Sequence, residues 1–300
     1  MRARKIWDYV RGGEADCAII ACSILAGDMF VLVSPSGSHI VIDAGYHRDE
    51  NLLSEISSLP GKIEKIIITH QHVDHFGSLK VLQDRIGLNS TNILHSGIAL
   101  PPGYLPPYSL STCNYYLNDI EALWLGYHDA VGLSGCMGER WSEWSTGGIR
   151  VRNLFPEMPF SVADKIRIDP SKVDLNRATT PVEIIYEGNT LAVLASDINA
   201  GDYNRVLDRC CGTPSLLAPA SHGRPQSNPK EAMHTLNPDH IFISDHFPDS
   251  DFRFYYKESV GDHADIRSAN VDGHQIYFFL NGKIIRRELL HVTEAMVLAE

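Results

Sequence analysis

The chain has 300 residues, of which 44% are hydrophobic and 21% charged, and its formal net charge is −11. This length allows one large domain or two ordinary ones, and the composition is that of a folded protein and excludes wholesale disorder. The acidic excess argues against a protein that binds nucleic acids or anionic membranes through a broad basic face.

The first half of the chain is rich in strands, and helices join them from residue 51 onward. Short apolar runs separated by turn residues indicate the strands, and apolar residues three or four apart indicate the helices. We expect strands at residues 18–25, 29–33, 39–42, 63–69 and 92–94, and helices at residues 51–59 and 76–86. This alternation predicts sheets covered by helices.

The region from residue 96 to residue 150 breaks this pattern. It holds two proline pairs, three of the four tryptophans and many glycines, and only residues 117–125 indicate a short helix. One interpretation is an irregular insertion that packs on the main body. The other is a lid or substrate-selecting loop, because long irregular connections are often functional.

Regular elements return in the second half. We expect strands at residues 181–186, 190–195, 215–218, 240–244, 275–280 and 283–287, and helices at residues 202–210 and 229–236. The last two strands flank Asn281-Gly282, a strong hairpin signal. Because no low-complexity linker separates the two halves, we expect a single domain over residues 1–300 with an irregular insertion around residues 96–150.

The six cysteines include no C-x-x-C pair and do not form the framework of a small disulfide-rich fold. The charged start is not followed by a signal-peptide pattern, and no run of about 18 apolar residues is present. We therefore expect a cytoplasmic protein with reduced thiols and no membrane span.

Three histidines and an aspartate follow the apolar strand at residues 63–69, in the order His70, His72, Asp74 and His75. Residues two apart in an extended backbone point to the same side, so His70 and His72 can bind one ion together. The chain then turns into a helix, which directs Asp74 and His75 at a second ion. Imidazole and carboxylate ligands suit Zn²⁺ and, less exclusively, other first-row divalent ions such as Mn²⁺.

Two later residues extend this ligand set. Asp197 follows an apolar strand, where its carboxylate can bridge two cations, and the alternative role of a helix N-cap fits Asp202 better. His222 follows another strand and precedes Gly223, which lets the backbone approach closely. The sequence thus predicts six ligands for two ions: His70, His72, Asp74, His75, Asp197 and His222.

The order of these motifs resembles the metallo-β-lactamase superfamily. The resemblance rests on Asp43-Ala44-Gly45 after a strand, His-x-His-x-Asp-His at residues 70–75, Ser196-Asp197 after a strand, and His222-Gly223. Within the superfamily, Gly27-Asp28 and Asn176 are similar to positions in the hydrolase domain of bacterial competence DNA-uptake proteins and their free-standing relatives. The resemblance implies an α/β fold, an αββα four-layer sandwich of two mixed β-sheets flanked by helices, with two divalent ions at one edge.

The chain also departs from that family pattern. Ser221 and Arg224 stand where the competence subgroup often has histidine and serine. Most superfamily members have a further histidine on the first ion, but the corresponding strand end, residues 153–156, has none. The first ion is then left with His70, His72 and Asp197 from the protein, and water in the remaining positions. A coordination shell with such open positions suits catalysis. The alternatives are a weaker affinity for the ion, or the binding of a metal other than zinc.

Three further residues have expected roles in the reaction. Asp43 matches a superfamily aspartate that holds a ligand histidine or the His70–His75 loop, although it could simply start a turn. His246 follows a strand and is a candidate general acid, or else an exposed histidine. Arg224 could contact an anionic substrate group, or form a surface salt bridge.

The predicted function is metal-dependent hydrolysis of a phosphodiester by a water that two metal ions activate, with Asp74 orienting that water. A small phosphodiester fits the charge of −11 better than nucleic acid. One alternative is a lactone, thioester or β-lactam-type hydrolase. Another is a metal-stabilised binding or regulatory module without turnover, against which the two aspartates Asp74 and Asp197 argue. The oligomeric state is not predicted.

Overall fold

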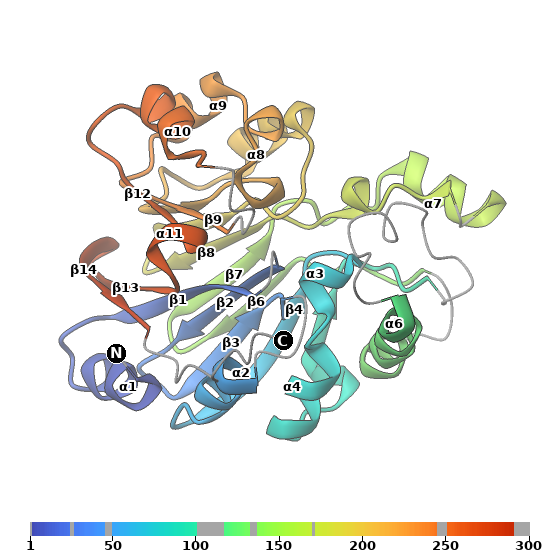
Figure 1. Ribbon diagram of the computed structural model, residues 1–300, viewed down its shortest axis with the longest axis horizontal. Coiled ribbons are helices and arrows are strands. Elements are labelled where there is room, and N and C mark those ends of the chain that lie inside the picture. The colour runs from blue at the N-terminus through green and yellow to red at the C-terminus, as the bar shows by residue number, and fades with distance from the viewer. Residues whose placement is uncertain are drawn as a thin grey trace, which may run out of the picture.

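The computed structural model describes residues 2–24, 27–45, 50–100, 117–132, 137–169, 172–244 and 251–290. Two seven-stranded sheets lie face to face, and helices cover the outer face of each sheet (Figure 1). The predicted αββα sandwich of two mixed sheets is therefore confirmed.

The first sheet has the strand order β14-β13-β1-β2-β3-β4-β5. Its pairs are antiparallel from β14 to β3 and parallel from β3 to β5. The strands are β1 (Cys17–Ile24), β2 (Gly27–Val33), β3 (Ser38–Ile42), β4 (Lys62–Ile68), β5 (Ile93–His95), β13 (Gln275–Leu280) and β14 (Lys283–Leu289).

The second sheet has the order β12-β11-β10-β9-β8-β7-β6. Its pairs are parallel from β12 to β9 and antiparallel from β9 to β6. The strands are β6 (Glu143–Thr146), β7 (Ile149–Asn153), β8 (Val182–Tyr186), β9 (Asn189–Leu194), β10 (Leu216–Ala218), β11 (His240–Ile243) and β12 (Asp265–Ser268).

Helices form the two outer layers. Those on the first sheet are α1 (Ala3–Arg11), α2 (Glu50–Ser57), α3 (Val73–Phe76), α4 (Leu79–Ile86) and α6 (Leu117–Val131). Those on the second sheet are α8 (Tyr203–Arg209), α9 (Lys230–Leu236) and α10 (Arg253–Val260). The others are α7 (Phe160–Ile168) and α11 (Ala269–Asp272), and the 3₁₀ turns are η1 (Ser90–Asn92), η4 (Leu175–Ala178), η5 (Ala200–Asp202), η6 (Ser221–Gly223) and η7 (Pro225–Ser227).

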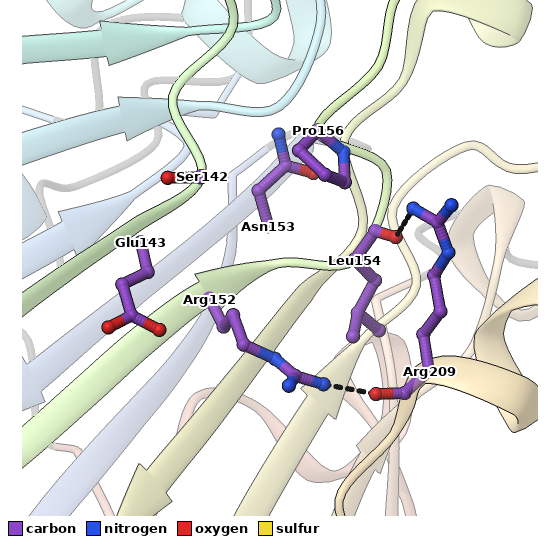
Figure 2. Close-up of a pocket in the computed structure, with 7 residues that line it drawn as sticks. All are labelled: Ser142, Glu143, Arg152, Asn153, Leu154, Pro156 and Arg209. Carbon is purple, nitrogen blue, oxygen red and sulfur yellow. Dashed lines mark hydrogen bonds between the residues drawn. The ribbon is translucent and has the colours of Figure 1, made fainter.

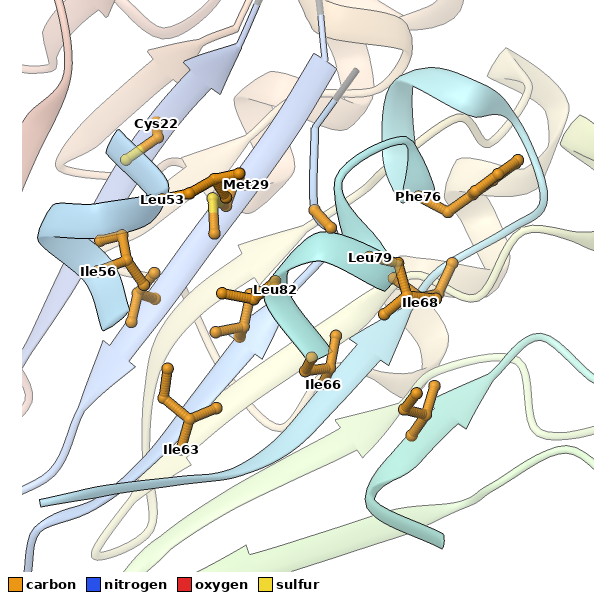
Figure 3. Packing of buried hydrophobic residues seen from close by; sticks show 14 of the residues in the cluster. Cys22, Met29, Leu53, Ile56, Ile63, Ile66, Ile68, Phe76, Leu79 and Leu82 are labelled. Carbon is orange, nitrogen blue, oxygen red and sulfur yellow. The ribbon is translucent and has the colours of Figure 1, made fainter. Parts of the chain in front are cut away.

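The uninterrupted isoleucine run of β4 shows how the sequence builds these layers. Ile66 and Ile68 belong to the core under the helices, whereas Ile67 belongs to the core between the two sheets. Successive side chains of a strand point to opposite faces, so a strand buried on both faces needs apolar residues throughout. Figure 3 shows Ile66 and Ile68 beside Leu79 and Leu82 of α4. This packing fixes the end of β4, from which the histidine cluster starts.

The structure corrects several predicted elements. The helix expected at residues 76–86 is two helices, α3 and α4, separated by Gly77 and Ser78. The expected irregular stretch at residues 96–150 contains a longer helix, α6, and the hairpin of β6 with the start of β7. Helices α1, α7 and α10 and strand β12 were not predicted. Residues 101–116 and 133–136 lie outside the described residues, so the lid and the single domain stay predictions.

No helix among the described ranges combines the length and the apolar character that a membrane crossing requires.

His39 on β3 is a fully buried histidine far along the strand from the cluster. Its Nδ1 accepts a hydrogen bond from the Ser34 backbone nitrogen at 3.3 Å, and its Nε2 donates one to the Pro60 carbonyl at 2.7 Å. Both ring nitrogens are therefore used in the neutral form. Burial lowers the pKa of His39 below its ordinary value of 6.5, despite the opposing effect of the Pro60 hydrogen bond.

This lowered pKa predicts a specific acid sensitivity. The unfolded chain binds a proton at His39 near pH 6.5, whereas the folded chain does so only at lower pH. The contribution of neutral His39 to the free energy of unfolding is thus complete above about pH 6.5. It is lost as the pH falls towards the pKa of His39 in the folded chain. Urea unfolding across this range should show a smaller pH dependence for His39→Gln than for the wild type. Identical pH dependence in the two proteins would contradict this assignment.

Candidate metal centre

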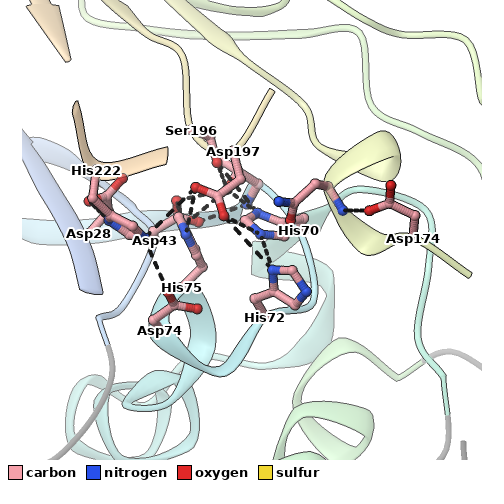
Figure 4. A network of polar contacts seen from close by, with 12 residues as sticks. Asp28, Asp43, His70, His72, Asp74, His75, Asp174, Ser196, Asp197 and His222 are labelled. Carbon is pink, nitrogen blue, oxygen red and sulfur yellow. Dashed lines mark hydrogen bonds and ion pairs between the residues drawn. The ribbon is translucent and has the colours of Figure 1, made fainter. Parts of the chain in front are cut away.

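The predicted ligands meet at one edge of the sandwich, where strands from both sheets end. His70 follows β4 of the first sheet, and Asp197 and His222 follow β9 and β10 of the second sheet. Figure 4 shows these side chains converging from the two sheets, together with His72, Asp74 and His75. All six predicted ligands therefore lie in one cluster.

The backbone at this edge is strained at several non-glycine residues. Asp43, Ser196, Ser221 and His222 have φ angles of 56°, 52°, 49° and 57°. Such left-handed conformations cost energy for residues with a Cβ atom, and they concentrate at functional sites. The strain at Ser196 and His222 accompanies the placement of the Asp197 and His222 side chains in the cluster.

The first group of candidate ligands consists of His70, His72 and Asp197. The Nε2 atom of His70 lies 2.9 Å from the Nδ1 atom of His72. The Oδ2 atom of Asp197 lies 3.6 Å from the first nitrogen and 3.9 Å from the second. Ligand atoms bound to one tetrahedral zinc ion stand about 3.3 Å apart, so this triangle fits a single ion.

The second group faces the other oxygen of the same carboxylate. The Oδ1 atom of Asp197 lies 3.6 Å from Nε2 of His75 and 3.8 Å from Nε2 of His222. The latter nitrogen is also 3.1 Å from Oδ2 of Asp74. One oxygen of Asp197 therefore faces each group, which is the arrangement that a bridging carboxylate requires.

Two buried atoms of the cluster have no hydrogen-bond partner in the described residues. They are Nε2 of His75 and Oδ1 of Asp197. Buried polar atoms are almost always paired with protein, water or an ion, so two unpaired atoms facing each other need an explanation. Their 3.6 Å separation leaves room for an ion bound to both. The residues present thus fit divalent metal ions.

Hydrogen bonds hold His75 through the nitrogen that faces away from the cluster. The Nδ1 of His75 donates to Oδ2 of Asp43 at 2.8 Å. Asp43 is fixed in turn by the hydroxyl and the backbone nitrogen of Thr69, each at 2.8 Å. A carboxylate so placed orients a ligand imidazole and raises its basicity, and this positioning role of Asp43 stays a prediction.

A buried carboxylate also contacts the second nitrogen of His222, and the sequence analysis does not predict this contact. The Nδ1 of His222 lies 3.1 Å from Oδ1 of Asp28, a buried residue on β2. Because this contact uses the nitrogen that faces away from Asp74, Asp28 orients His222 with its Nε2 towards Asp74 and Asp197. The Gly27-Asp28 pair was noted only as part of the family resemblance.

The protonation states in the absence of metal follow from burial and charge. Burial lowers the pKa of His70 to about 3, so its Nε2 lone pair is available at neutral pH. Burial also opposes the charged form of His75, but Asp43 and Asp74 outweigh it and raise the pKa of His75 well above its ordinary value. Metal ions bind deprotonated ligands, so a metal ion at this group must displace a proton from His75.

Among the described residues, Asn153 and Arg224 are not part of the two ligand groups. Asn153 stands at the strand end where the family pattern has a further histidine and this chain has none. Its side chain forms hydrogen bonds with the backbone of Trp141 and Phe155. His246, the candidate general acid, lies outside the described residues. Arg224 follows η6 and is half-buried, and its contact with a substrate stays a prediction.

A cavity of about 270 Å³ near the end of β7 contains none of the predicted site residues (Figure 2). Its two arginines bind the protein itself: Arg152 pairs with the buried Glu183 at 2.8 Å, and Arg209 donates to the Leu154 carbonyl at 2.8 Å. These contacts make the cavity part of the scaffold.

Residues 25–131, which include Asp43 and the four clustered ligands from His70 to His75, match the family model of the Metallo-beta-lactamase superfamily. No curated protein sequence matches the chain. The narrower relationship to competence DNA-uptake proteins stays a prediction.

The chain is also similar to solved structures. Igni18, a metallo hydrolase from the hyperthermophilic archaeon Ignicoccus hospitalis KIN4/I, is 16% identical, with a TM-score of 0.50 over 88% of this chain and 100% of that one. An isothiocyanate hydrolase from Delia radicum gut bacteria is 11% identical, with a TM-score of 0.46 over 84% and 95% of the two chains. The B3 metallo-beta-lactamase BLEG-1 is 11% identical, with a TM-score of 0.36 over 73% and 82%.

The contacts of Asp43 predict an effect on metal binding. In Asp43→Asn, the His75 ring loses its charged partner, and the affinity for the second ion should fall about 10- to 100-fold. Zinc titration against a chromogenic chelator measures this change. The matched control is Asp84→Asn, whose side chain is 63% exposed on α4. Equal affinities in both variants would contradict the positioning role of Asp43.

Proposed function

We propose that this protein is a metal-dependent hydrolase that acts on a small phosphodiester with two divalent ions, Zn²⁺ or alternatively Mn²⁺. The observation that carries the proposal is the placement of Asp197 between two ligand groups, with one oxygen towards each. Two ions that share a carboxylate can lower the pKa of water and stabilise negative charge on both the attacking and the leaving oxygen of a phosphodiester.

The exposure of the candidate ligands indicates the side from which substrate approaches. The side chains of Asp74 and His72 are 31% and 22% exposed, whereas those of the other four ligands are at most 9% exposed. Substrate therefore reaches the cluster between Asp74 and His72. In this proposal, Asp74 accepts a hydrogen bond from a water molecule there and so orients it for attack.

A second cavity, of about 380 Å³, supports an anionic substrate. Its lining includes Asn199, two residues after Asp197, and Asp174, which Figure 4 shows on the His70 and His72 side of the cluster. Two arginines also line it, Arg177 and Arg205. Each pairs with one nearby aspartate, at 3.5 Å and 3.2 Å, but a guanidinium has five donors and can also bind a phosphate.

The charge of the chain favours a small substrate over a polymer. A net charge of −11 repels polyanions, and the sequence has no run of lysines or arginines to form a basic groove. Two metal ions and a few arginines, with Arg224 among them, are sufficient to neutralise one phosphate. Among the described residues, Cys17, Cys210 and Cys211 form no disulfide, which accords with the proposed cytoplasmic location.

A substrate panel tests this function. We expect the zinc- or manganese-loaded protein to hydrolyse a chromogenic phosphodiester in preference to a lactone, a thioester or a β-lactam. The KM should respond only mildly to salt and should rise in Arg224→Ala. Hydrolysis of the lactone or thioester alone would replace the phosphodiester by the alternative substrate class. Steeply salt-dependent DNA cleavage without small-ester turnover would assign a polymer substrate, and metal binding without any turnover would assign a binding module.

A further inference from the structure

The two candidate ion sites differ in the number of protein ligands. Among the described residues, the side chains of Asp74, His75, Asp197 and His222 face the second ion, whereas those of His70, His72 and Asp197 face the first. Granted the proposed dinuclear site, we infer that the side-chain amide oxygen of Asn176 is the fourth protein ligand of the first ion, in the place of a further histidine.

Hydrogen bonds tie the segment that carries Asn176 to the residue that precedes the first ligand group. Asn176 lies in η4, where its backbone nitrogen donates to Oδ1 of Asp174 at 3.1 Å. In Figure 4, Asp174 lies on the His70 side of the cluster, away from His222. Four residues later, the backbone nitrogen and the hydroxyl of Thr180 donate to the carbonyl of Thr69 at 3.0 Å and 2.9 Å. Thr69 directly precedes His70, so this turn is tied to the base of the first ligand group.

The Oδ1 atom of Asn176 is buried and has no hydrogen-bond partner in the described residues. It shares this property with Oδ1 of Asp197 and Nε2 of His75, the two unpaired atoms at the centre of the cluster. An unpaired buried amide oxygen is unfavourable unless water or an ion occupies the space before it. An ion held by His70 and His72 supplies that missing partner.

The chemistry of an amide oxygen also suits this position. Carbonyl oxygens are harder ligands than imidazole, and they bind Mn²⁺ or Mg²⁺ more readily than a third histidine would. With Asn176, the first ion has two nitrogen and two oxygen ligands, the same donor set as the second ion. The first site should therefore accept Mn²⁺ as well as Zn²⁺.

The experiment measures metal affinity at the first site alone. In a His222→Ala background, which removes a ligand of the second ion only, zinc and manganese affinities are determined by competition with a chelator. We expect Asn176→Ala to weaken binding about 10- to 100-fold. Asn176→Asp keeps the shape and the oxygen and adds a charge, so it should bind more tightly than the parent. Lys172→Ala, four residues before Asn176 with a side chain that is 75% exposed, is the control and should bind like the parent.

The outcomes separate this inference from the proposed function. Unchanged metal affinity in Asn176→Ala, or weaker binding in Asn176→Asp, would overturn the ligand role of Asn176. If the wild type binds two ions in that case, the proposed dinuclear site still stands. No metal in the wild type and the parent variant would instead overturn the proposed function. If Asn176→Ala does not fold, as judged by circular dichroism, Asn176→Asp decides, because a purely structural role for the amide gives no reason for tighter metal binding.

Discussion

Substitution of Asp197 by alanine is expected to remove both metal ions and to lower turnover by at least about 10³-fold. The reason is geometric: its Oδ2 faces His70 and His72, and its Oδ1 faces His75 and His222. Each ion contributes several kcal/mol to the stabilisation of developing charge, and about 4 kcal/mol corresponds to 10³-fold. Metal analysis of the dialysed protein, together with turnover of the phosphodiester, measures both effects.

A neighbouring aspartate provides the control for this substitution. Asp202 lies in η5, close in sequence to Asp197, and pairs with Arg205 at 3.2 Å. Asp202→Ala should keep both ions. Retention of two ions in Asp197→Ala would show that this carboxylate does not bridge them, whatever the effect on turnover.

Substitution of His222 by alanine should have the second largest effect, and a more selective one. His222 contacts Asp74 and the Oδ1 atom of Asp197, but it faces neither ligand nitrogen of the first group. We therefore expect one ion to remain and turnover to fall about 10²-fold or more, because a single ion cannot stabilise both the attacking and the leaving oxygen.

The complementary substitution tests the same division of ligands. His72→Ala should weaken the first ion, since its Nδ1 lies 2.9 Å from Nε2 of His70, and should leave the second in place. Metal content with Zn²⁺ and Mn²⁺, combined with the spectrum of Co²⁺-substituted protein, distinguishes the two single-ion forms. Loss of both ions in each variant would mean that the sites do not fill independently.

The local part of the site could be predicted from the sequence because it is contiguous. His70, His72, Asp74 and His75 follow one buried strand, so their directions depend only on the strand geometry and the turn after it. Asp197 and His222 were found because each follows an apolar strand in the region that resembles the superfamily. The αββα arrangement came from the same resemblance rather than from periodicity alone.

The partners of the ligands were harder to find, because they depend on contacts between distant segments. Asp28 reaches His222 across 194 positions of sequence, and Thr69 contacts Ser196 across 127 positions. No local sequence pattern predicts either of these contacts. Likewise, a ligand role for Asn176 can be inferred only from the structure, in which its amide oxygen is buried without a hydrogen-bond partner among the described residues.

The missed helices have physical causes of different kinds. Helix α1 buries Ala3, Ile6, Trp7 and Val10 on one face, a pattern visible in the sequence but considered only as a targeting segment. Helix α7 instead buries only Val162 and Ile166 and leaves its end residues Phe160 and Ile168 79% and 76% exposed, so its apolar residues do not follow one face.

The most direct test of the dinuclear site is the anomalous scattering of zinc in crystals of the zinc-loaded protein. Our account predicts two peaks about 3.5–4 Å apart, on either side of the Asp197 carboxylate. The first should lie between His70 and His72, and the second should be in contact with His75 and His222. A single peak, or two peaks that do not both touch Asp197, would contradict the account.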